Sequence, residues 1–565
     1  MWRDPTRMAT ELHDVIVVGG GIHGACAAWE AARRGLKVAL IEAGDFGQET
    51  SGNSLRTLHG GLRHLQRLDF LRMRESIRAR REWLHLAPHL TRPMRFLLPT
   101  SGHGVRGPGV MRAALWINDL VGADRNRGVL EDRHLPMGSV LGLDELQSSC
   151  PGLPVTGCNG TAAWYDAVCL NTERLQLAVV RAATACGAQV ANYVRALRPT
   201  VAKGVICGVR ARDELTGREL DLRAPAVINA AGPWVDEWLT EPGERQLTRA
   251  FRASKAFNLL TRPLPFRDAL GLSVAPRNRT TGGRANTYFI IPWNGFSLVG
   301  TRHLRCDHAA RSARVTREEV LEFVADLNTV LGGHCLSGSD VYHVYAGLLP
   351  EADRTPGPDV ALQRAPHVID HTKDGMRGLV SIVGVKWTTA GAVGAQAAAL
   401  ACRLLRKPGQ PTRARTLEEG GRPNSRPQGS EAVPELGLPL LAHLDDIYGT
   451  SRNQVIALLR DDPLFMVRVV PDMPVVMGQA VYAVRDEMAL HLRDVVKRRL
   501  PLYLSNELDH AALLACAMAM ARELRWSRRE MMTEVEEVEA ELAAVQQPWV
   551  RAGSVLDPHL IANEG

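Results

Sequence analysis

The chain has 565 residues, which allows two or three domains and a large hydrophobic core. Its formal net charge of +7 is compatible with an anionic small molecule, an anionic membrane surface or nucleic acid. Because the sequence shows no aromatic platform and no basic recognition helix, we expect no nucleic acid partner. The ten cysteines form no C-x-x-C pair, which argues against a metal site or a disulfide framework and indicates reduced thiols in the cytoplasm.

The sequence contains no segment that predicts insertion into a membrane. Its first residues, MWRDPTRMATELHD, are polar and lack the apolar region of a signal peptide. No apolar run approaches the roughly 18 residues that a transmembrane helix needs. We therefore expect a cytoplasmic protein whose membrane contact, if it has one, is peripheral and on the inner face. The candidate surface is the stretch 91–120, where apolar residues accompany Arg92, Arg95, Arg106 and Arg112.

A strand, a glycine turn and a helix open the chain. Val15–Val18 is a short apolar run of the kind found in buried parallel strands. Gly19, Gly21 and Gly24 then form the pattern G-x-G-x-x-G where a helix should begin. The first glycine allows a tight turn, the second lets the backbone approach a pyrophosphate, and the third lets helix and strand pack closely. The pattern predicts a dinucleotide-binding unit.

An acidic residue completes this unit. Glu42 follows a second predicted strand, Val38–Ile41, and stands 18 residues after Gly24. A carboxylate there can accept both ribose hydroxyls and would repel a 2′-phosphate, which argues against NADP. These residues alone leave NAD and FAD open.

The remaining elements follow in chain order. The region 94–142 is expected to be rich in loops. The other predicted ranges are, for helices, 69–86, 111–120, 172–186 and 316–330, and, for strands, 189–195, 204–210 and 226–229, with further strands across 255–300. The segment 407–435 is rich in Pro, Gly, Arg and Ser and predicts a linker or surface loop. Beyond it, three or more amphipathic helices and a helical stretch at 528–544 predict an all-helical C-terminal domain.

Three later stretches bear on the identity of the dinucleotide. VINAAGPWVDEW, at 227–238, is a buried strand that runs into an Ala-Gly turn, and FIIPW with LVGT, at 289–293 and 298–301, is a strand pair. IVGVKWTTAGAVGAQAA, at 382–398, is a strand, a glycine turn and a second helix N-terminus. That helix N-terminus suits a contact with an anion or with a flavin oxygen, because it presents free N–H groups.

Together with HGGLRHLQ, at 59–66, these stretches resemble the FAD-dependent glycerol-3-phosphate dehydrogenases of the D-amino-acid-oxidase-like flavoprotein superfamily. The resemblance runs from about Asp14 to Leu405, and the C-terminal helices with VYAVRDEMA, at 481–489, resemble that family's extra domain. The resemblance implies that the opening motif binds FAD rather than NAD. We expect this FAD to be non-covalent, because no His or Cys lies in a recognised attachment motif.

The resemblance implies an α/β fold with an added helical part. It comprises a Rossmann-like FAD-binding domain, an antiparallel-sheet substrate domain and an all-helical C-terminal domain. The expected boundaries are 1–90, 151–240 and 340–406 for the FAD-binding domain, 91–150 and 241–339 for the substrate domain, 407–435 for the linker and 436–548 for the helical domain.

The resemblance also implies an activity. The family oxidises the secondary hydroxyl of sn-glycerol 3-phosphate by hydride transfer to flavin N5 and passes the electrons to quinone at the membrane. We therefore expect an FAD-dependent dehydrogenase that acts on glycerol 3-phosphate or a related anionic polyol. Its expected electron acceptor is quinone or another acceptor, and a homodimer stays open.

The expected cofactor contacts lie on the turns and loops that the resemblance covers. They are Gly19, Gly21, Gly24, Glu42, Thr50, Ser51, Gly60, Val194, Gly232, Gly384, Lys386 and Thr388.

Four residues are expected to act on the substrate and one to bind its phosphate. The HGGLRY arginine of the family, which lies near substrate, corresponds to Arg63, and the lysine of its GGKLTT turn, close to the flavin, corresponds to Lys386. The later of its two phosphate-binding arginines corresponds to Arg364. His303 and His59 are the candidates for the base that takes the hydroxyl proton.

The substrate region departs from the family pattern, whereas the FAD framework is intact. Leu349 stands where the family has its other phosphate-binding arginine, and His64 replaces the tyrosine of HGGLRY. Where the family has G-T-T-D, this chain has GTRH, which places Arg302 and His303 at these positions. Where the family has a serine followed by a histidine, this chain has Ser254 and Lys255. We expect either that Arg302 restores the phosphate clamp, or that the substrate is a different polyol phosphate, a phosphonate or another α-hydroxy anion.

Two other functions stay open at this point. One is a flavin oxidase that acts on an amine, hydroxy acid or phosphonate and uses oxygen, which peroxide formation would reveal. The other is a degenerate flavoprotein that serves as a binding subunit, which would stay colourless when FAD is added.

Overall fold

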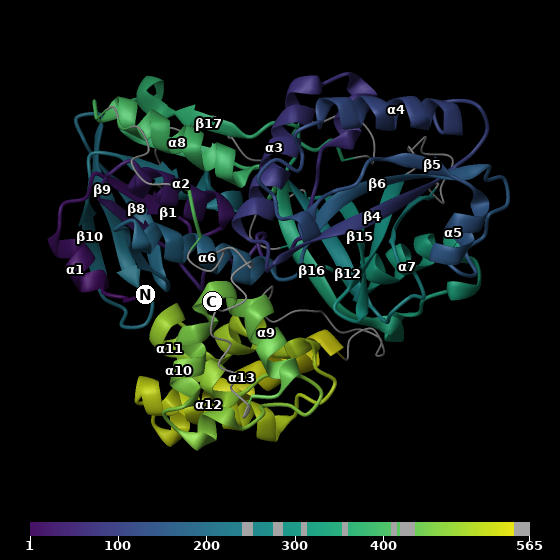
Figure 1. Ribbon diagram of the computed structural model, residues 1–565. Helices are drawn as coiled ribbons and strands as arrows, with labels where there is room; N and C mark the ends of the chain where they lie inside the picture. Colours follow the sequence, from purple (N-terminus) through teal and green to yellow (C-terminus); the bar gives the residue numbers. More distant parts are fainter. Residues whose placement is uncertain are drawn as a thin grey trace.

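The computed structural model describes residues 1–239, 252–274, 286–306, 313–352, 360–407, 409, 415–417 and 436–546. Figure 1 shows two lobes that each contain β-sheet and lie side by side, with the C-terminal helices gathered beneath them. Most of the expected linker lies outside the described residues. Within the described ranges, no helix is both long enough and apolar enough to cross a bilayer.

The first lobe is built on a six-stranded sheet with the order β17-β18-β11-β1-β2-β7. All neighbouring pairs are parallel except β17 with β18. Every residue of β1, β2 and β11 is buried, as expected for parallel strands that are covered on both faces. The strands are β1 (Val15–Val18), β2 (Val38–Ile41), β7 (Gln189–Ala191), β11 (Val227–Asn229), β17 (His367–Asp370) and β18 (Leu379–Val383).

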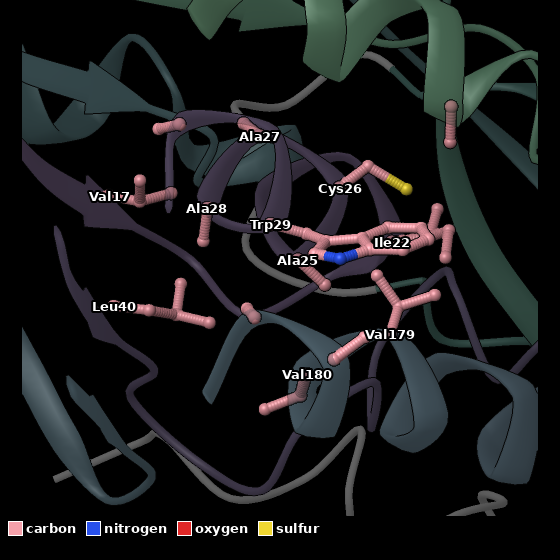
Figure 2. Close-up of a cluster of buried hydrophobic side chains, with 14 of the residues drawn as sticks. Val17, Ile22, Ala25, Cys26, Ala27, Ala28, Trp29, Leu40, Val179 and Val180 are labelled. Carbon is pink, nitrogen blue, oxygen red and sulfur yellow. The ribbon is translucent and has the colours of Figure 1, made fainter. Parts of the chain in front are cut away.

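Three helices form a layer on this sheet. They are α2 (Ile22–Arg33), α6 (Thr172–Ala185) and α8 (Ala390–Leu404). Figure 2 shows Trp29 of α2 extending toward Val179 of α6 within this apolar cluster. A Cβ on Gly394 of α8 would lie 2.6 Å from the backbone of Cys26, so the two helices touch through their backbones. The small residues of α2 and α8 therefore permit this close packing.

A three-stranded antiparallel sheet and one short helix cover the opposite face. Strands β8 (Val194–Ala202), β9 (Val205–Asp213) and β10 (Glu219–Arg223) pair in the order β10-β9-β8, and α1 (Pro5–Thr10) precedes β1. Ile16 and Val18 contribute to the apolar cluster on this side, whereas Val15 and Val17 contribute to the helical side. This alternation is that of a strand buried on both faces.

The second lobe contains a nine-stranded sheet in the order β16-β12-β15-β14-β13-β4-β6-β3, with β5 paired to β6. Helix α7 (Arg317–Leu331) packs on one face, and α4 (Pro108–Val121) packs on the other through Leu115. The strands are β3 (Thr57–Leu58), β4 (Thr91–Thr100), β5 (Ser139–Leu141), β6 (Gly160–Cys169), β12 (Ala253–Thr261), β13 (Ala269–Val274), β14 (Asn286–Trp293), β15 (Phe296–Arg305) and β16 (Val341–Pro350). The remaining helices here are α3 (Phe70–Leu86), α5 (Leu143–Ser149) and the 3-10 turn η1 (Leu62–Arg67).

The second sheet corrects two sequence-based expectations. The region 94–142 is less loop-rich than expected, because β4 pairs along its whole length with β6 despite two prolines. The expected boundaries assign 160–169 and 341–350 to the FAD-binding domain, but their backbones pair with β4 and β12 of the second sheet. Pairing between distant strands places these segments, and no local pattern reveals it.

The described C-terminal residues are helical and have their own apolar clusters. The helices are α9 (Leu438–Tyr448), α10 (Arg452–Leu459), α11 (Met477–Glu487), α12 (His510–Leu524) and α13 (Arg528–Gln546), with a π-helical turn, η12 (Asp494–Arg499), between α11 and α12. The all-helical C-terminal domain is thus confirmed.

Candidate cofactor and substrate site

The opening glycine turn leaves no room for side chains. Gly19 has a φ of +98°, and a Cβ there would lie 2.5 Å from the carbonyl oxygen of Ala230. A Cβ on Gly24 would lie 1.9 Å from the carbonyl oxygen of Gly19. Gly21 is the N-cap of α2, directly in front of the helix N-terminus. The turn therefore brings bare backbone to the carboxyl end of β1, where a pyrophosphate binds in folds of this kind.

Glu42 holds the turn from the end of β2. Its carboxylate accepts the Gly20 N–H at 2.6 Å and the Gly44 N–H at 2.9 Å. Burial raises the pKa of Glu42, and these two hydrogen bonds act against that rise. The carboxylate has further acceptor capacity toward a ribose hydroxyl, because each oxygen offers two lone pairs.

The segment 43–53, which we call the cofactor loop, connects this turn to the second lobe. Ser51 Oγ accepts the N–H of Ile22 at 3.0 Å, at the N-terminus of α2. Thr50 Oγ1 accepts the N–H of Leu348 in β16 at 3.3 Å. Two of the expected cofactor contacts therefore lie between the helix N-terminus and the substrate sheet.

Two other expected contacts lie beside the same turn. Val194 donates its N–H to the carbonyl oxygen of Glu42 at 2.7 Å. Gly232 has a φ of +59° at the carboxyl end of β11, and a Cβ there would meet nothing within 4 Å. This conformation favours glycine through its backbone rather than through crowding.

One residue that the sequence reasoning missed is His23, in the first turn of α2. Its Nε2 is buried and has no hydrogen-bond partner in the described part of the chain. A Cβ on Gly384 would lie 2.3 Å from its ring, so His23 joins the opening turn to the GVKW loop. Burial lowers the pKa of His23 to about 4, which leaves the ring neutral at pH 7. Its polar position inside G-x-G-x-x-G was the only signal in the sequence.

These features fit FAD. The glycine cradle, the acid at the end of β2 and an unpaired buried nitrogen at the helix N-terminus are groups that a dinucleotide would engage.

A second cluster lies where the HGGLRH and GVKW loops meet. Lys386 Nζ and His64 Nε2 are 2.5 Å apart. Burial, and then the charge of Lys386, lower the pKa of His64 to about 4. Burial, followed by the charges of Arg72 and Arg63, lowers the pKa of Lys386. The pair is therefore an ammonium that donates to a neutral imidazole.

Arg63 is the cation that this cluster leaves uncompensated. It is exposed on η1, and no carboxylate of the described residues forms an ion pair with it. Its charge contributes to lowering the pKa values of His59, His64, His303 and Lys386. Arg63 therefore lies within electrostatic reach of all three other expected catalytic residues.

His59 is held at the junction of the two lobes. The backbone N–H of His59 donates to Thr388 Oγ1 at 3.2 Å, and its ring Nδ1 lies 4.0 Å from Asp166 Oδ2. Burial lowers the pKa of His59, and Asp166 opposes that shift. Asp166 also accepts the Gly60 N–H at 2.6 Å and pairs with Arg80, so a residue absent from the expected set fixes this loop.

Arg302 and His303 are adjacent on β15 and point to opposite faces. Arg302 Nη1 lies 2.5 Å from Asp326 of α7, and its Nη2 lies 3.3 Å from Glu322. His303 faces the side of Arg63, and its Nδ1 is buried without a partner among the described residues. Strand alternation directs the guanidinium of Arg302 to two carboxylates of α7, which argues against the expected role of Arg302 as a phosphate ligand.

Leu349 and Arg364 lie on neighbouring segments. Leu349 is half-buried in β16 and pairs with Ser254, whose hydroxyl donates to the Leu349 carbonyl at 3.1 Å. The N–H of Gln363 donates to the carbonyl of Pro350 at 2.9 Å, which brings the exposed Arg364 alongside the end of β16. Arg364 is thus near the position that Leu349 occupies.

A pocket lies behind the cofactor loop, and it is lined by none of the expected site residues. Its walls come from the cofactor loop, Glu173 of α6, β16 and the C-terminal residues Lys497, Arg498 and Tyr503. The expected chemistry lies elsewhere, on the side of Arg63 and Lys386.

Two family models match the chain. A model described as FAD dependent oxidoreductase matches residues 14–400, and one described as C-terminal domain of alpha-glycerophosphate oxidase matches residues 412–531.

Curated relatives match nearly the whole chain. Glycerol-3-phosphate dehydrogenase of Synechocystis sp. is 30% identical over 541 residues, which cover 93% of this chain and 95% of the relative. Glycerol-3-phosphate dehydrogenase of Mycobacterium leprae is 32% identical over 562 residues, which cover 96% and 91%. Among solved structures, the glycerol-3-phosphate dehydrogenase from Bacillus halodurans complexed with FAD has the same fold, with a TM-score of 0.73, 23% identity, and coverage of 97% of this chain and 98% of its own.

Proposed function

Because this chain belongs to the family of FAD-dependent oxidoreductases, we propose that it oxidises the secondary hydroxyl of glycerol 3-phosphate or a closely related anionic polyol. The expected cofactor, FAD, and the expected enzyme class are thereby confirmed. The substrate is a proposal, and it rests on the relatives together with the charges around Arg63.

The observation that carries the proposal is an uncompensated cation among neutral bases. Arg63 and Lys386 are positive, whereas His64 and His303 have pKa values lowered to about 4 by burial and are neutral at pH 7. An alcohol with an anionic end matches this arrangement. Its anion compensates Arg63, and a neutral imidazole can accept the hydroxyl proton.

The glycine turn, Glu42 and His23 would hold FAD, which would supply the acceptor for the hydride from the carbon that bears the hydroxyl. The protein's own groups orient the substrate and move the proton. Arg63 and Arg364 would hold the anionic end, and Lys386 would stabilise negative charge on a bound flavin. His303 is the base that we propose, because its buried Nδ1 has no partner among the described residues and is free to accept a proton.

The proposed electron acceptor is based on an exposed apolar surface of the protein. We propose that electrons pass to quinone or a similar acceptor at an anionic membrane, which the protein contacts through a face formed by α4 and the start of α3. Trp116 and Leu120 of α4 are 64% and 61% exposed, and Leu71 of α3 is 82% exposed. In Figure 1 α4 and the C-terminal helices lie at opposite ends of the molecule.

The basic residues of this face differ from the expected four. Arg92 pairs with Asp446, and Arg95 pairs with Glu145 and Asp268. Arg112 stands four residues before Trp116 on α4, Arg106 precedes this helix, and both arginines are exposed. The latter two therefore supply the attraction to anionic lipid. Such a surface suits attachment to the inner face of a membrane.

One experiment tests the substrate. The purified flavoprotein is mixed without oxygen with glycerol 3-phosphate, glycerol or glycerol 2-phosphate, and the flavin absorbance is followed. We expect glycerol 3-phosphate to bleach the flavin, and glycerol to do so far more slowly because it lacks the anion that compensates Arg63. Equal rates with glycerol would contradict the proposal. Re-oxidation by a quinone analogue, compared with peroxide formation in air, then separates a dehydrogenase from an oxidase.

A further inference from the structure

The start of the cofactor loop is buried against the C-terminal helical domain. Asp45 is the third residue after Glu42, and none of its surface is exposed. Its carboxylate is bound by residues that follow it by 453 and 454 positions in the chain. A segment of the cofactor site therefore depends on the far end of the sequence.

Two arginines of η12 bind this carboxylate. Arg499 donates from Nη1 to Oδ2 at 2.6 Å and from Nη2 to Oδ1 at 2.9 Å, which is a bidentate pair. Arg498 donates from Nε to Oδ2 at 2.5 Å. Burial alone would raise the pKa of Asp45, but the charges of Arg499 and Arg498 lower it below its usual range. The carboxylate is therefore ionised and fully engaged.

Asn192, in the turn before β8, joins the same contact. Its Nδ2 donates to Asp45 Oδ1 at 3.1 Å and to the carbonyl oxygen of Met488 at 2.9 Å. One side-chain amide therefore bridges the cofactor loop and the C-terminal domain.

The next two residues extend this connection to Glu42. The hydroxyl of Tyr193 donates to Asp494 Oδ1 at 2.7 Å, and Val194 donates its N–H to the carbonyl of Glu42. The helical domain thus contacts both Asp45, three residues after Glu42, and Tyr193, which precedes the residue bonded to Glu42.

We propose that Asp45 is a positioning residue for FAD, anchored by Arg498 and Arg499 of the helical domain. It acts by holding the cofactor loop in the conformation that presents Thr50 and Ser51, without itself touching the cofactor. The helical domain, which contains none of the expected site residues, thereby takes part in cofactor binding.

A second buried ion pair across the same junction provides a matched control. Arg174 of α6 donates from Nη1 to Glu487 at 2.6 Å, and neither side chain is exposed. The member of this pair in the first lobe, Arg174, lies on a helix rather than on the cofactor loop. Loss of this pair should weaken domain docking without releasing the loop.

The test compares Asp45→Asn with Glu487→Gln in the full-length apoprotein. FAD is titrated by the quenching of its fluorescence, and the Tm of each apoprotein is measured in parallel. We expect Asp45→Asn to weaken FAD binding by about tenfold or more, because Arg499 loses its carboxylate, Arg498 keeps only its pair with Asp494, and the loop is released. Glu487→Gln should lower the Tm to a similar extent and leave the FAD dissociation constant within about twofold.

Two results would overturn the proposal: an unchanged FAD affinity in Asp45→Asn, or an equal loss in both variants. Arg499→Lys keeps the positive charge but cannot form both hydrogen bonds, and we expect an intermediate loss of FAD affinity. If Asp45→Asn is insoluble, Arg499→Lys is compared with Glu487→Gln instead. An unchanged FAD affinity in Arg499→Lys would then count against the proposal. The measurement involves no substrate, so an error in the proposed substrate would not affect it.

Discussion

Lys386 and His64 stand 322 positions apart in the sequence and form a hydrogen bond of 2.5 Å. The ammonium donates to a neutral ring, because burial and the charge of Lys386 hold the pKa of His64 at about 4. The family resemblance leads us to expect His64 to bind substrate, because it stands where the family has the tyrosine of HGGLRY. The structure connects it to the lysine that we propose lies beside the flavin, and this contact supports a role in positioning Lys386.

The first prediction concerns this hydrogen bond. His64→Phe removes the acceptor that favours the charged form of Lys386, so the pKa of Lys386 should fall further. The alkaline limb of kcat/KM should then move to lower pH, and kcat should fall by about tenfold. His64→Gln retains an acceptor and should keep most of the activity. Gln66→Ala, on the exposed side of the same turn, is the control, and an identical pH profile for His64→Phe and wild type would refute this role.

The second prediction concerns stability in acid. Burial, assisted by neighbouring arginines, lowers the pKa of His89 to about 3 from an ordinary value of 6.5. Between these values the unfolded chain binds a proton that the folded protein does not, so the free energy of unfolding falls as pH decreases. His89→Leu should reduce that fall by at most about 1.4 kcal/mol per pH unit. Urea unfolding at several pH values measures the slope, with the exposed His103→Leu as control. An unchanged slope in His89→Leu would argue against a neutral buried ring.

The third prediction concerns the missing phosphate ligand. Leu349→Arg places a guanidinium beside the segment of Arg364, and it should lower KM for glycerol 3-phosphate by up to about tenfold, or about 1.4 kcal/mol. Tyr342→Arg, at the exposed opposite end of β16, should leave KM unchanged. If the natural substrate is bulkier or less charged, the new cation is buried without a partner and native activity falls. A KM for glycerol 3-phosphate that does not respond to Leu349→Arg would contradict both versions.

The fourth prediction concerns how FAD is held. We expect acid precipitation to leave the flavin in the supernatant, because the binding is non-covalent. Glu42→Arg should weaken FAD binding, since it removes the carboxylate that accepts the Gly20 and Gly44 N–H groups. Fluorescence titration of the apoprotein measures the effect. Flavin that stays on the precipitated polypeptide would exclude non-covalent binding.

The fifth prediction concerns the proposed membrane face. Binding to vesicles that contain anionic lipid should weaken as salt is raised, because screening shortens the reach of Arg106 and Arg112. Trp116→Ser should weaken it further by removing exposed apolar surface. Leu438→Ser removes an apolar residue that is 83% exposed on α9, one of the C-terminal helices beneath the two lobes in Figure 1, and should have no effect. Equal losses in the two variants, or indifference to salt, would place the contact elsewhere.

The cofactor-binding part of the molecule could be predicted from the sequence, because its motif depends on residues close together in the chain. The strand Val15–Val18, the three glycines and Glu42 lie within one βαβ unit, so their spacing predicts a dinucleotide site, while the choice of FAD came from the resemblance of later stretches to a known family. The C-terminal helices were equally readable, because helical periodicity is a local property.

Only the tertiary structure decided which side chains face the substrate site. Whether Arg302 or His303 faces the site depends on how β15 pairs with β12, since a strand directs successive side chains to opposite faces. Lys386 meets His64, and Asp45 meets Arg499, only after segments more than 300 residues apart are folded together. Such contacts produce no fixed spacing between the two residues in the sequence. The chain between them can differ in length and still let the same surfaces pack.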